Sequence, residues 1–210
     1  LLANLYRATR RAFHAAHGVV AISEQYLRWG LDMADRPAAS GDIVMPHGYP
    51  DPFETLGTPG VTSGGQGPLP PSPRSDDPKI FWFVGTFVGS IDLMTVIKCA
   101  RSLRHRTDIR IVLSGDGERG AEWRSLAAGL DNVTFTGWVD QEELRRLASQ
   151  AYAGLAAYKA GALMSLTNKI FEYLGYGLPL LVSLPGEART LVESGRCGLF
   201  YEPGDANSLR

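Results

Sequence analysis

Short apolar runs alternate with helical patterns from residue 79 to the end of the chain. Runs such as 80–84 (IFWFV) and 179–183 (PLLVS) lack the alternation of a half-exposed strand, which indicates strands of a parallel sheet buried on both faces. Between them, apolar residues recur at the spacing of amphipathic helices. This succession predicts an α/β fold with a doubly wound, Rossmann-like parallel sheet. We expect strands at 80–84, 109–113, 133–136, 153–157, 179–183 and 198–200, and helices at 91–104, 120–129, 140–149, 167–176 and 187–194.

A stretch rich in Gly and Pro separates this region from the start of the chain. Ten of the nineteen residues from 57 to 75 are Gly or Pro, a composition that allows neither a helix nor a strand ladder. We therefore expect a linker or a long surface loop at 57–78 and one domain at 79–210. A length of 210 residues suits one domain and part of another.

Residues 1–56 contain a smaller set of the same elements. The chain begins with apolar residues at helical spacing, and Arg7, Arg10 and Arg11 fill the opposite face of that helix. A basic amphipathic helix of this kind can lie on an anionic membrane surface, although most such faces are simply solvated. The single strand-helix-strand unit that follows is too small to be a domain. It is expected to comprise a strand at 19–22, a helix capped by Ser23 and ended by Gly30, and a strand at 43–45.

The composition excludes several classes of protein. With 44% apolar residues, 20% charged residues and a net charge of -1, the chain is too hydrophobic for intrinsic disorder and too neutral for a general nucleic-acid surface. Its longest uncharged apolar stretch, 80–91, is shorter than the roughly 20 residues that span a membrane. Cys99 and Cys197 are isolated, so neither a disulfide scaffold nor a metal site is expected, and a cytoplasmic location is the default. Leu1 and Arg210 look like the ends of an excised piece of a longer protein.

Ligands of doubly wound sheets bind at the carboxyl ends of the strands, and the residues at those ends indicate the kind of ligand. Gly85 and Thr86 follow the first strand, where a small residue lets the backbone approach a ligand. After the fourth strand, Ser165 or Thr167 is expected to cap a helix that has Lys169 in its first turn. A helix N-terminus with a lysine suits a diphosphate, and Glu172 could accept hydrogen bonds from a ribose. The alternative is an exposed ion pair between Lys169 and Glu172.

A second glycine-rich turn points to a different ligand. The residues from Gly115 to Gly120 read GDGERG, a literal match to the dinucleotide fingerprint, and Asp140 follows about twenty residues later. On this interpretation Gly115, Gly117, Gly120 and Asp140 would hold NAD(P) in an oxidoreductase. An ordinary tight turn before a helix fits the same glycines.

The sequence from Val19 onward resembles the nucleotide-sugar-dependent glycosyltransferases of the GT-B fold, in particular the retaining enzymes of group 1. Each motif is short, and the resemblance depends on their order and spacing over some 190 residues. The motifs are VVAISE from Val19, MPHGY from Met45, Val84-Gly85-Thr86, the Gly115-Asp116-Gly117 turn, NVTFTGWV from Asn132, Asn168-Lys169-Ile170-Phe171-Glu172-Tyr173-Leu174, Gly177-Leu178-Pro179 and Gly186-Glu187.

This resemblance implies a role for each part of the chain. Residues 79–210 would be most of the C-terminal domain that binds the sugar nucleotide, and residues 1–56 would be the tail of the N-terminal acceptor domain and the interdomain connection. Met164 stands where the group usually has a second glutamate, eight positions before Glu172, and the run from Gly85 to Asp92 lacks the usual basic residues. The implied donor-binding residues are Gly85 and Thr86 beside the diphosphate, Trp138 and Val139 at the base, Lys159 and Lys169 at the phosphates, and Glu172 at the ribose, together with Asn168.

The resemblance therefore implies a hexosyltransferase that needs no metal or cofactor. It would transfer a sugar from a UDP- or GDP-linked donor to a glycan or lipid-linked acceptor, with retention, in the biosynthesis of a polysaccharide at the cytoplasmic face of the membrane. Because the acceptor-side groups are largely absent, the fragment alone is expected to bind nucleotide weakly and to turn over nothing. Three alternatives remain open: the NAD(P)-dependent oxidoreductase, a non-catalytic nucleotide-sugar-binding module, and a UDP-sugar epimerase.

Overall fold

The computed structural model describes residues 2–48 and 77–210, so most of the linker expected at 57–78 lies outside the described residues. The chain forms two compact units, residues 1–48 and residues 49–210.

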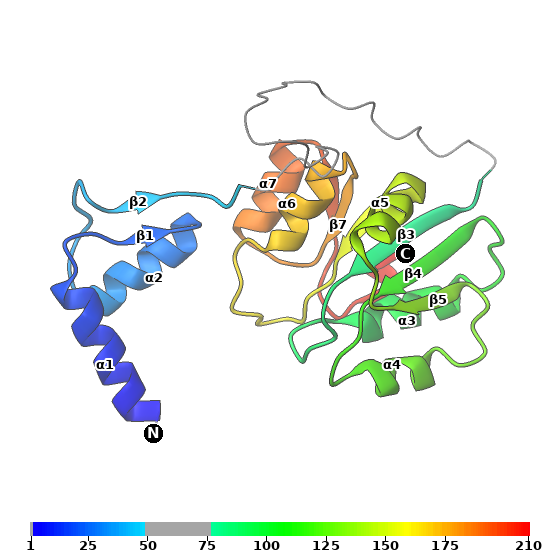
Figure 1. The fold of residues 1–210 in the computed structure, drawn as a ribbon, viewed down its shortest axis with the longest axis horizontal. Helices are drawn as coiled ribbons and strands as arrows, with labels where there is room; N and C mark the ends of the chain where they lie inside the picture. The colour runs from blue at the N-terminus through cyan, green and yellow to red at the C-terminus, as the bar shows by residue number, and fades with distance from the viewer. Residues whose placement is uncertain (1, 49–76) are drawn as a thin grey trace. The chain divides into compact units, whose positions relative to one another are not determined.

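The second unit is built on a six-stranded sheet with the strand order β5-β4-β3-β6-β7-β8 (Figure 1). All five neighbouring pairs are parallel, which confirms the doubly wound α/β prediction. Helices α3 and α4 lie on one side of the sheet, and α5, α6 and α7 lie on the other. The strands are β3 (Lys79–Val84), β4 (Ile109–Ser114), β5 (Val133–Gly137), β6 (Ala151–Ala156), β7 (Leu180–Val182) and β8 (Gly198–Phe200); the helices are α3 (Leu93–Ser102), α4 (Gly120–Leu126), α5 (Gln141–Gln150), α6 (Asn168–Gly175), α7 (Glu187–Ser194) and α8 (Ala206–Leu209).

The strand order reverses between β3 and β6. The crossover after β3 leads to one side of the sheet and the crossover after β6 leads to the other, so the loops that follow these two strands diverge and leave a crevice, where ligands of such sheets bind. Backbone hydrogen bonds tie the two loops at their base. Asp92 N donates to Ala157 O (3.1 Å), and Lys159 N donates to Ser90 O (3.0 Å).

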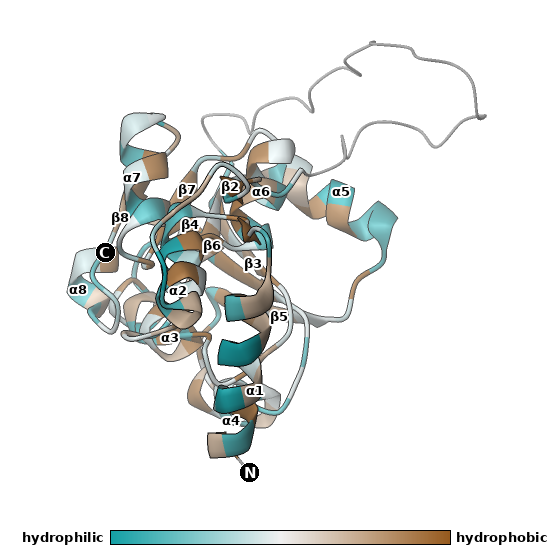
Figure 2. Cartoon of the chain, turned by 90° about the vertical axis from the view of Figure 1, so that its left-hand side faces the viewer, coloured by the Kyte–Doolittle hydropathy of each residue, from teal (hydrophilic) through white to brown (hydrophobic). Residues whose placement is uncertain are grey.

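The core of this unit is unusually aromatic. Trp82, Phe83, Phe87, Trp123 and Tyr173 are all at most 1% exposed. The indole nitrogen of Trp82 is buried as well. This Nε1 donates a hydrogen bond to Ser114 Oγ at 2.9 Å, so the polar group has a partner inside the core. Along α5 at the surface, hydrophilic and hydrophobic residues alternate in the amphipathic pattern that the sequence predicts (Figure 2).

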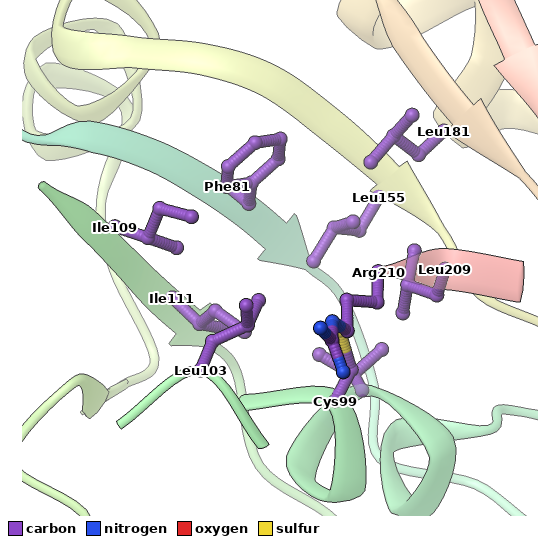
Figure 3. A pocket seen from close by; sticks show the side chains of 10 residues that line it. Phe81, Cys99, Leu103, Ile109, Ile111, Leu155, Leu181, Leu209 and Arg210 are labelled. Atoms are coloured by element: carbon purple, nitrogen blue, oxygen red, sulfur yellow. The ribbon is translucent and has the colours of Figure 1, made fainter. Parts of the chain in front are cut away.

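A small cavity of about 60 Å³ lies between α3 and the sheet (Figure 3). Its walls are mostly apolar, and they include Phe81, Leu155 and Leu181 from the sheet and Cys99 from α3. Burial raises the pKa of the Cys99 thiol to about 11, so the thiol stays protonated at neutral pH. Residues such as Ile109, the first of its strand, place this cavity away from the carboxyl ends of the strands.

The first unit contains α1 (Leu2–Ala15), β1 (Val20–Ala21), α2 (Glu24–Ala34) and β2 (Ile43–Val44). The strands β1 and β2 are parallel, so the predicted strand-helix-strand unit is confirmed. Ser23 caps α2 as expected, since its Oγ accepts a hydrogen bond from Tyr26 N at 3.3 Å.

The predicted end of α2 at Gly30 is wrong. Gly30 is buried inside the helix, which continues to Ala34 and ends at Asp35 in a left-handed conformation. A glycine in a helix costs only about 1 kcal/mol, and packing of Leu27 and Met33 outweighs that cost. None of the helices in residues 2–48 and 77–210 is long and apolar enough to cross a membrane.

Candidate functional site

Helix α6 is anchored at the point where the strand order reverses. Tyr173 is fully buried on α6, and its Oη accepts a hydrogen bond from Val84 N on β3 (3.0 Å) and donates one to Leu155 O on β6 (3.3 Å). Burial raises the pKa of Tyr173, so the hydroxyl keeps the proton that it donates. Lys169 precedes Tyr173 by four residues and therefore lies on the same side of the helix. The anchor thus directs Lys169 toward the carboxyl end of β3.

The ammonium group of Lys169 lies at the end of β3. Its Nζ donates to Val84 O at 2.5 Å and lies 4.9 Å from the centre of the Phe83 ring. Burial lowers the pKa of Lys169, while the nearby carboxylate of Glu172 acts in the opposite direction. An ammonium group has three donors, and the bond to Val84 occupies one of them. The structure therefore places a partly desolvated cation, with donor capacity to spare, at the ligand-binding edge of the sheet.

Gly85 makes room for this cation. A β-carbon at Gly85 would lie 1.8 Å from Lys169 Nζ, and its φ of 141° falls in the region that favours glycine. The next residue, Thr86, is exposed at the same strand end. The structure thus brings Gly85 and Lys169 together, although they are more than eighty residues apart in the chain.

Thr167, one of the two predicted candidates, is the N-cap of α6, but the expected capping hydrogen bond is not made. Thr167 occupies the N-cap position without a side-chain hydrogen bond to the helix, and the hydroxyl of Ser165 donates instead to Glu187 Oε2. Thr167 is 8% exposed, and its Oγ1 has no hydrogen-bond partner among the described residues. A buried hydroxyl without a partner costs about 1–3 kcal/mol, so a ligand oxygen at the start of α6 would stabilise it. Sequence reasoning missed this donor, because Thr at an N-cap normally bonds to its own helix.

The remaining predicted residues lie along the same edge of the sheet. Trp138 and Val139 follow β5, and β5 is two strands from β3, or roughly 10 Å away. Trp138 is 67% exposed, whereas Val139 packs against the core. Lys159 lies in the loop after β6, and Asn168 is exposed in the first turn of α6. Glu172 follows Lys169 by three residues, and it is near enough to affect the pKa of Lys169.

The turn that matches the dinucleotide fingerprint does not have the position that a dinucleotide site requires. It follows β4 rather than β3, the strand at the reversal of order where such a fingerprint belongs. β-carbons at Gly115 and Gly117 would lie 2.0 Å from Gly85 O and 2.7 Å from Phe87 O, so these glycines allow two loops to pack closely.

The acidic residue that would complete a dinucleotide site also has a structural role. Asp140 caps α5, and its Oδ1 accepts a hydrogen bond from Glu143 N at 2.9 Å. Asp116, inside the fingerprint, pairs with Arg124 at 3.0 Å. The NAD(P) interpretation of these residues is therefore wrong. In the described parts of the chain there is also no group of three or more His, Cys, Asp or Glu side chains arranged to hold a metal ion.

The sequence of residues 78–210 matches the protein family described as glycosyl transferases group 1. No curated protein sequence matches the chain significantly. Among solved structures, the chain is similar to HepE from Anabaena in complex with UDP and glucose, with 18% identity and a TM-score of 0.71 over 99% of this chain and 55% of that one.

Two further structures show the same likeness. Sucrose-phosphate synthase from Thermosynechococcus elongatus has 21% identity and a TM-score of 0.69, over 99% of this chain and 50% of that one. The pneumococcal O-GlcNAc transferase GtfA in complex with UDP and GlcNAc has 14% identity and a TM-score of 0.65, over 96% of this chain and 37% of that one. At these identities the likeness concerns the fold. The chain spans about half the length of HepE and of the synthase.

Proposed function

Because the chain belongs to the group 1 glycosyl transferases, we propose that the protein transfers a sugar from a nucleoside diphosphate sugar to a glycan or lipid-linked acceptor, with retention at the anomeric carbon. Its six-stranded parallel sheet is that of a Rossmann-like GT-B domain. On this proposal residues 79–210 bind a UDP- or GDP-linked donor, and residues 1–56 are the tail of the acceptor-binding domain and the connection between the two. The structures of HepE and GtfA with UDP support a uridine nucleotide as the first donor to test.

The observation that carries this proposal is the position of the Lys169 ammonium. When the sugar leaves its donor, negative charge develops on the departing diphosphate. A cation that already lies at the strand end stabilises this charge without reorganising, which is the usual source of a large rate effect. The start of α6 adds backbone donors and the positive end of the helix dipole, and the hydroxyl of Thr167 adds a further donor. Transfer therefore depends on charge stabilisation at this corner.

The other predicted residues extend the donor site from this corner. Glu172, nearly one turn further along α6, accepts hydrogen bonds from the ribose hydroxyls. The backbone at Trp138 and Val139 contacts the base, which lies toward β5. Gly85 and Thr86 line the diphosphate, and Lys159 and Asn168 add donors near the phosphates.

A basic helix supports the expected location at the cytoplasmic face of the membrane. In α1, Arg7 and Arg11 are exposed, and Leu2 and Leu5 are 81% and 64% exposed within the described residues. Exposed leucines beside arginines suit the boundary of an anionic bilayer. A role in polysaccharide biosynthesis would follow from an acceptor held at that surface.

A thermal-shift panel tests the donor class directly. At about 100 times its dissociation constant, UDP or GDP is expected to stabilise the chain by about 2.7 kcal/mol, which corresponds to roughly 5–10 °C in Tm. NADH at the same concentration is expected to give no shift. The space beside Gly115 and Gly117, where a dinucleotide would lie, is occupied by the backbone of Gly85 and Phe87. A shift with NADH and none with either nucleoside diphosphate would contradict the proposal.

The affinity for UDP or GDP is expected to fall as the pH rises through the lowered pKa of Lys169. Only the ammonium form of Lys169 binds the diphosphate, and burial lowers its pKa, so the favourable form is lost at a lower pH than for an ordinary lysine. Calorimetric titrations across the alkaline range would measure this, because the phosphate, with a second pKa of about 6, no longer changes its charge there. The uracil and guanine bases also lose a proton in this range, so the contribution of the lysine is the difference between the parent chain and a variant whose charge persists. A Lys169→Arg variant, whose charge persists, is expected to flatten the profile. If the affinity of the Lys169→Arg variant falls with pH as steeply as that of the parent chain, the fall is caused by a group other than Lys169.

A further inference from the structure

The loops after β6 and β7 emerge side by side at the edge of the sheet that carries the candidate site. The two strands are parallel neighbours, with Ala156 opposite Val182. Just beyond them, Ser183 Oγ accepts a hydrogen bond from Tyr158 N (2.7 Å) and donates one to Tyr158 O (2.9 Å). Because Ser183 is 1% exposed, these bonds fix the bases of both loops.

A second contact joins the far ends of these loops. Ser165 has no exposed surface, and its hydroxyl donates to Glu187 Oε2. Glu187 is half-buried and is the first residue of α7. Ser165 precedes Thr167, the N-cap of α6, by two residues, or at most about 7 Å of chain. The carboxylate of Glu187 is therefore bonded to a residue that precedes α6, whereas Glu172 lies inside that helix.

We propose that Glu187 binds hydroxyl groups of the transferred sugar and that Ser165 is its positioning residue. This inference rests on the proposed function. A nucleotide sugar places its diphosphate between the ribose and the sugar. If the ribose contacts Glu172 and the diphosphate lies at the start of α6, the sugar lies beyond that start, beside the loop that contains Ser165.

The chemistry of Glu187 suits this place. A carboxylate has about four acceptor sites, so one group can accept hydrogen bonds from sugar hydroxyls as well as from Ser165. Met164, the residue before Ser165, packs against the main hydrophobic core and offers no carboxylate. In this corner the charged acceptor thus comes from α7, not from the loop after β6.

Separate titrations of nucleotide and nucleotide sugar test this role. The full chain and its Glu187→Gln variant are titrated with UDP, GDP, UDP-glucose, UDP-galactose, UDP-N-acetylglucosamine and GDP-mannose. Glutamine keeps the shape and can still accept from Ser165, so the fold should be retained. We expect the variant to bind the preferred nucleotide sugar about tenfold more weakly and the matching nucleoside diphosphate within twofold of the parent chain. Ser165→Ala should change the same ratio about threefold.

Glu193→Gln is the matched control, because Glu193 lies on the same helix in an exposed pair with Arg189. It is expected to leave both affinities unchanged. Equal losses for nucleotide and nucleotide sugar in Glu187→Gln, or no loss of either, would overturn the role of Glu187 and leave the proposed function standing. A parent chain that binds neither UDP nor GDP would instead overturn the proposed function, and the inference with it.

Discussion

Replacing Lys169 with methionine is expected to weaken the binding of UDP or GDP about 10- to 100-fold. A hydrogen bond to a charged group contributes about 1.5–3 kcal/mol, and here the charge is partly desolvated, which strengthens its attraction for a diphosphate. Methionine retains the apolar stem beside Phe83 but loses the hydrogen bond to Val84 O, so the free energy of unfolding should fall by about 1 kcal/mol. Calorimetric titration measures the affinity, and a thermal melt checks the fold.

The control for this variant is Lys98→Met. Lys98 is exposed on α3, on the opposite side of the sheet from α6, so the same change of net charge is made away from the site. Its affinity for the nucleotide is expected to stay within twofold of the parent chain. If Lys169→Met binds as tightly as Lys98→Met, the ammonium does not contact the diphosphate, and the proposed donor site loses its central observation.

Replacing Gly85 with alanine is expected to damage both stability and binding. The new β-carbon would lie 1.8 Å from Lys169 Nζ and 3.0 Å from its Cε, so the lysine must leave its place, and the backbone is strained at a φ of 141°. We expect the free energy of unfolding to fall by about 1–3 kcal/mol. The affinity for UDP or GDP should fall as far as in Lys169→Met, because the cation is displaced from the strand end.

Two comparisons separate the causes of this effect. Gly129→Ala introduces alanine at a positive φ of 75° with no atom within 4 Å, so it measures backbone strain without a collision. A double-mutant cycle then combines Gly85→Ala with Lys169→Ala. Because the lysine is already absent, Gly85→Ala should weaken binding no further in that background. Additive losses of affinity would show that Gly85 contacts the nucleotide independently of Lys169.

The elements of the large unit could be predicted from the sequence because their signals are local. The apolar run of β3 and the helical spacing of α3 depend on residues within one or two turns of one another. Local signals failed where packing overrode them. Gly30 was expected to end α2 but is buried inside that helix. Thr167 is the N-cap of α6, but its side chain makes no hydrogen bond to the helix.

The candidate site divides in the same way. The spacing of Lys169 and Glu172 on one helix follows from the sequence alone, as does the presence of small residues after the first strand. The meaning of the GDGERG turn does not, because the same letters serve either a ligand or the close packing of two loops. The tertiary structure distinguishes the two, because the strand order puts β3 rather than β4 at the reversal and the glycines pack against the loop after β3.

The sequence by itself therefore determined the alternation of strands and helices and the residue types at the strand ends, since periodicity is a property of neighbours in the chain. The tertiary structure decided which of those ends meet. Lys169 reaches Val84 across 85 positions, and Ser165 reaches Glu187 across 22. Contacts over such separations depend on the order in which the strands pair. That order is set by the packing of the whole sheet, so no stretch of the chain encodes it locally.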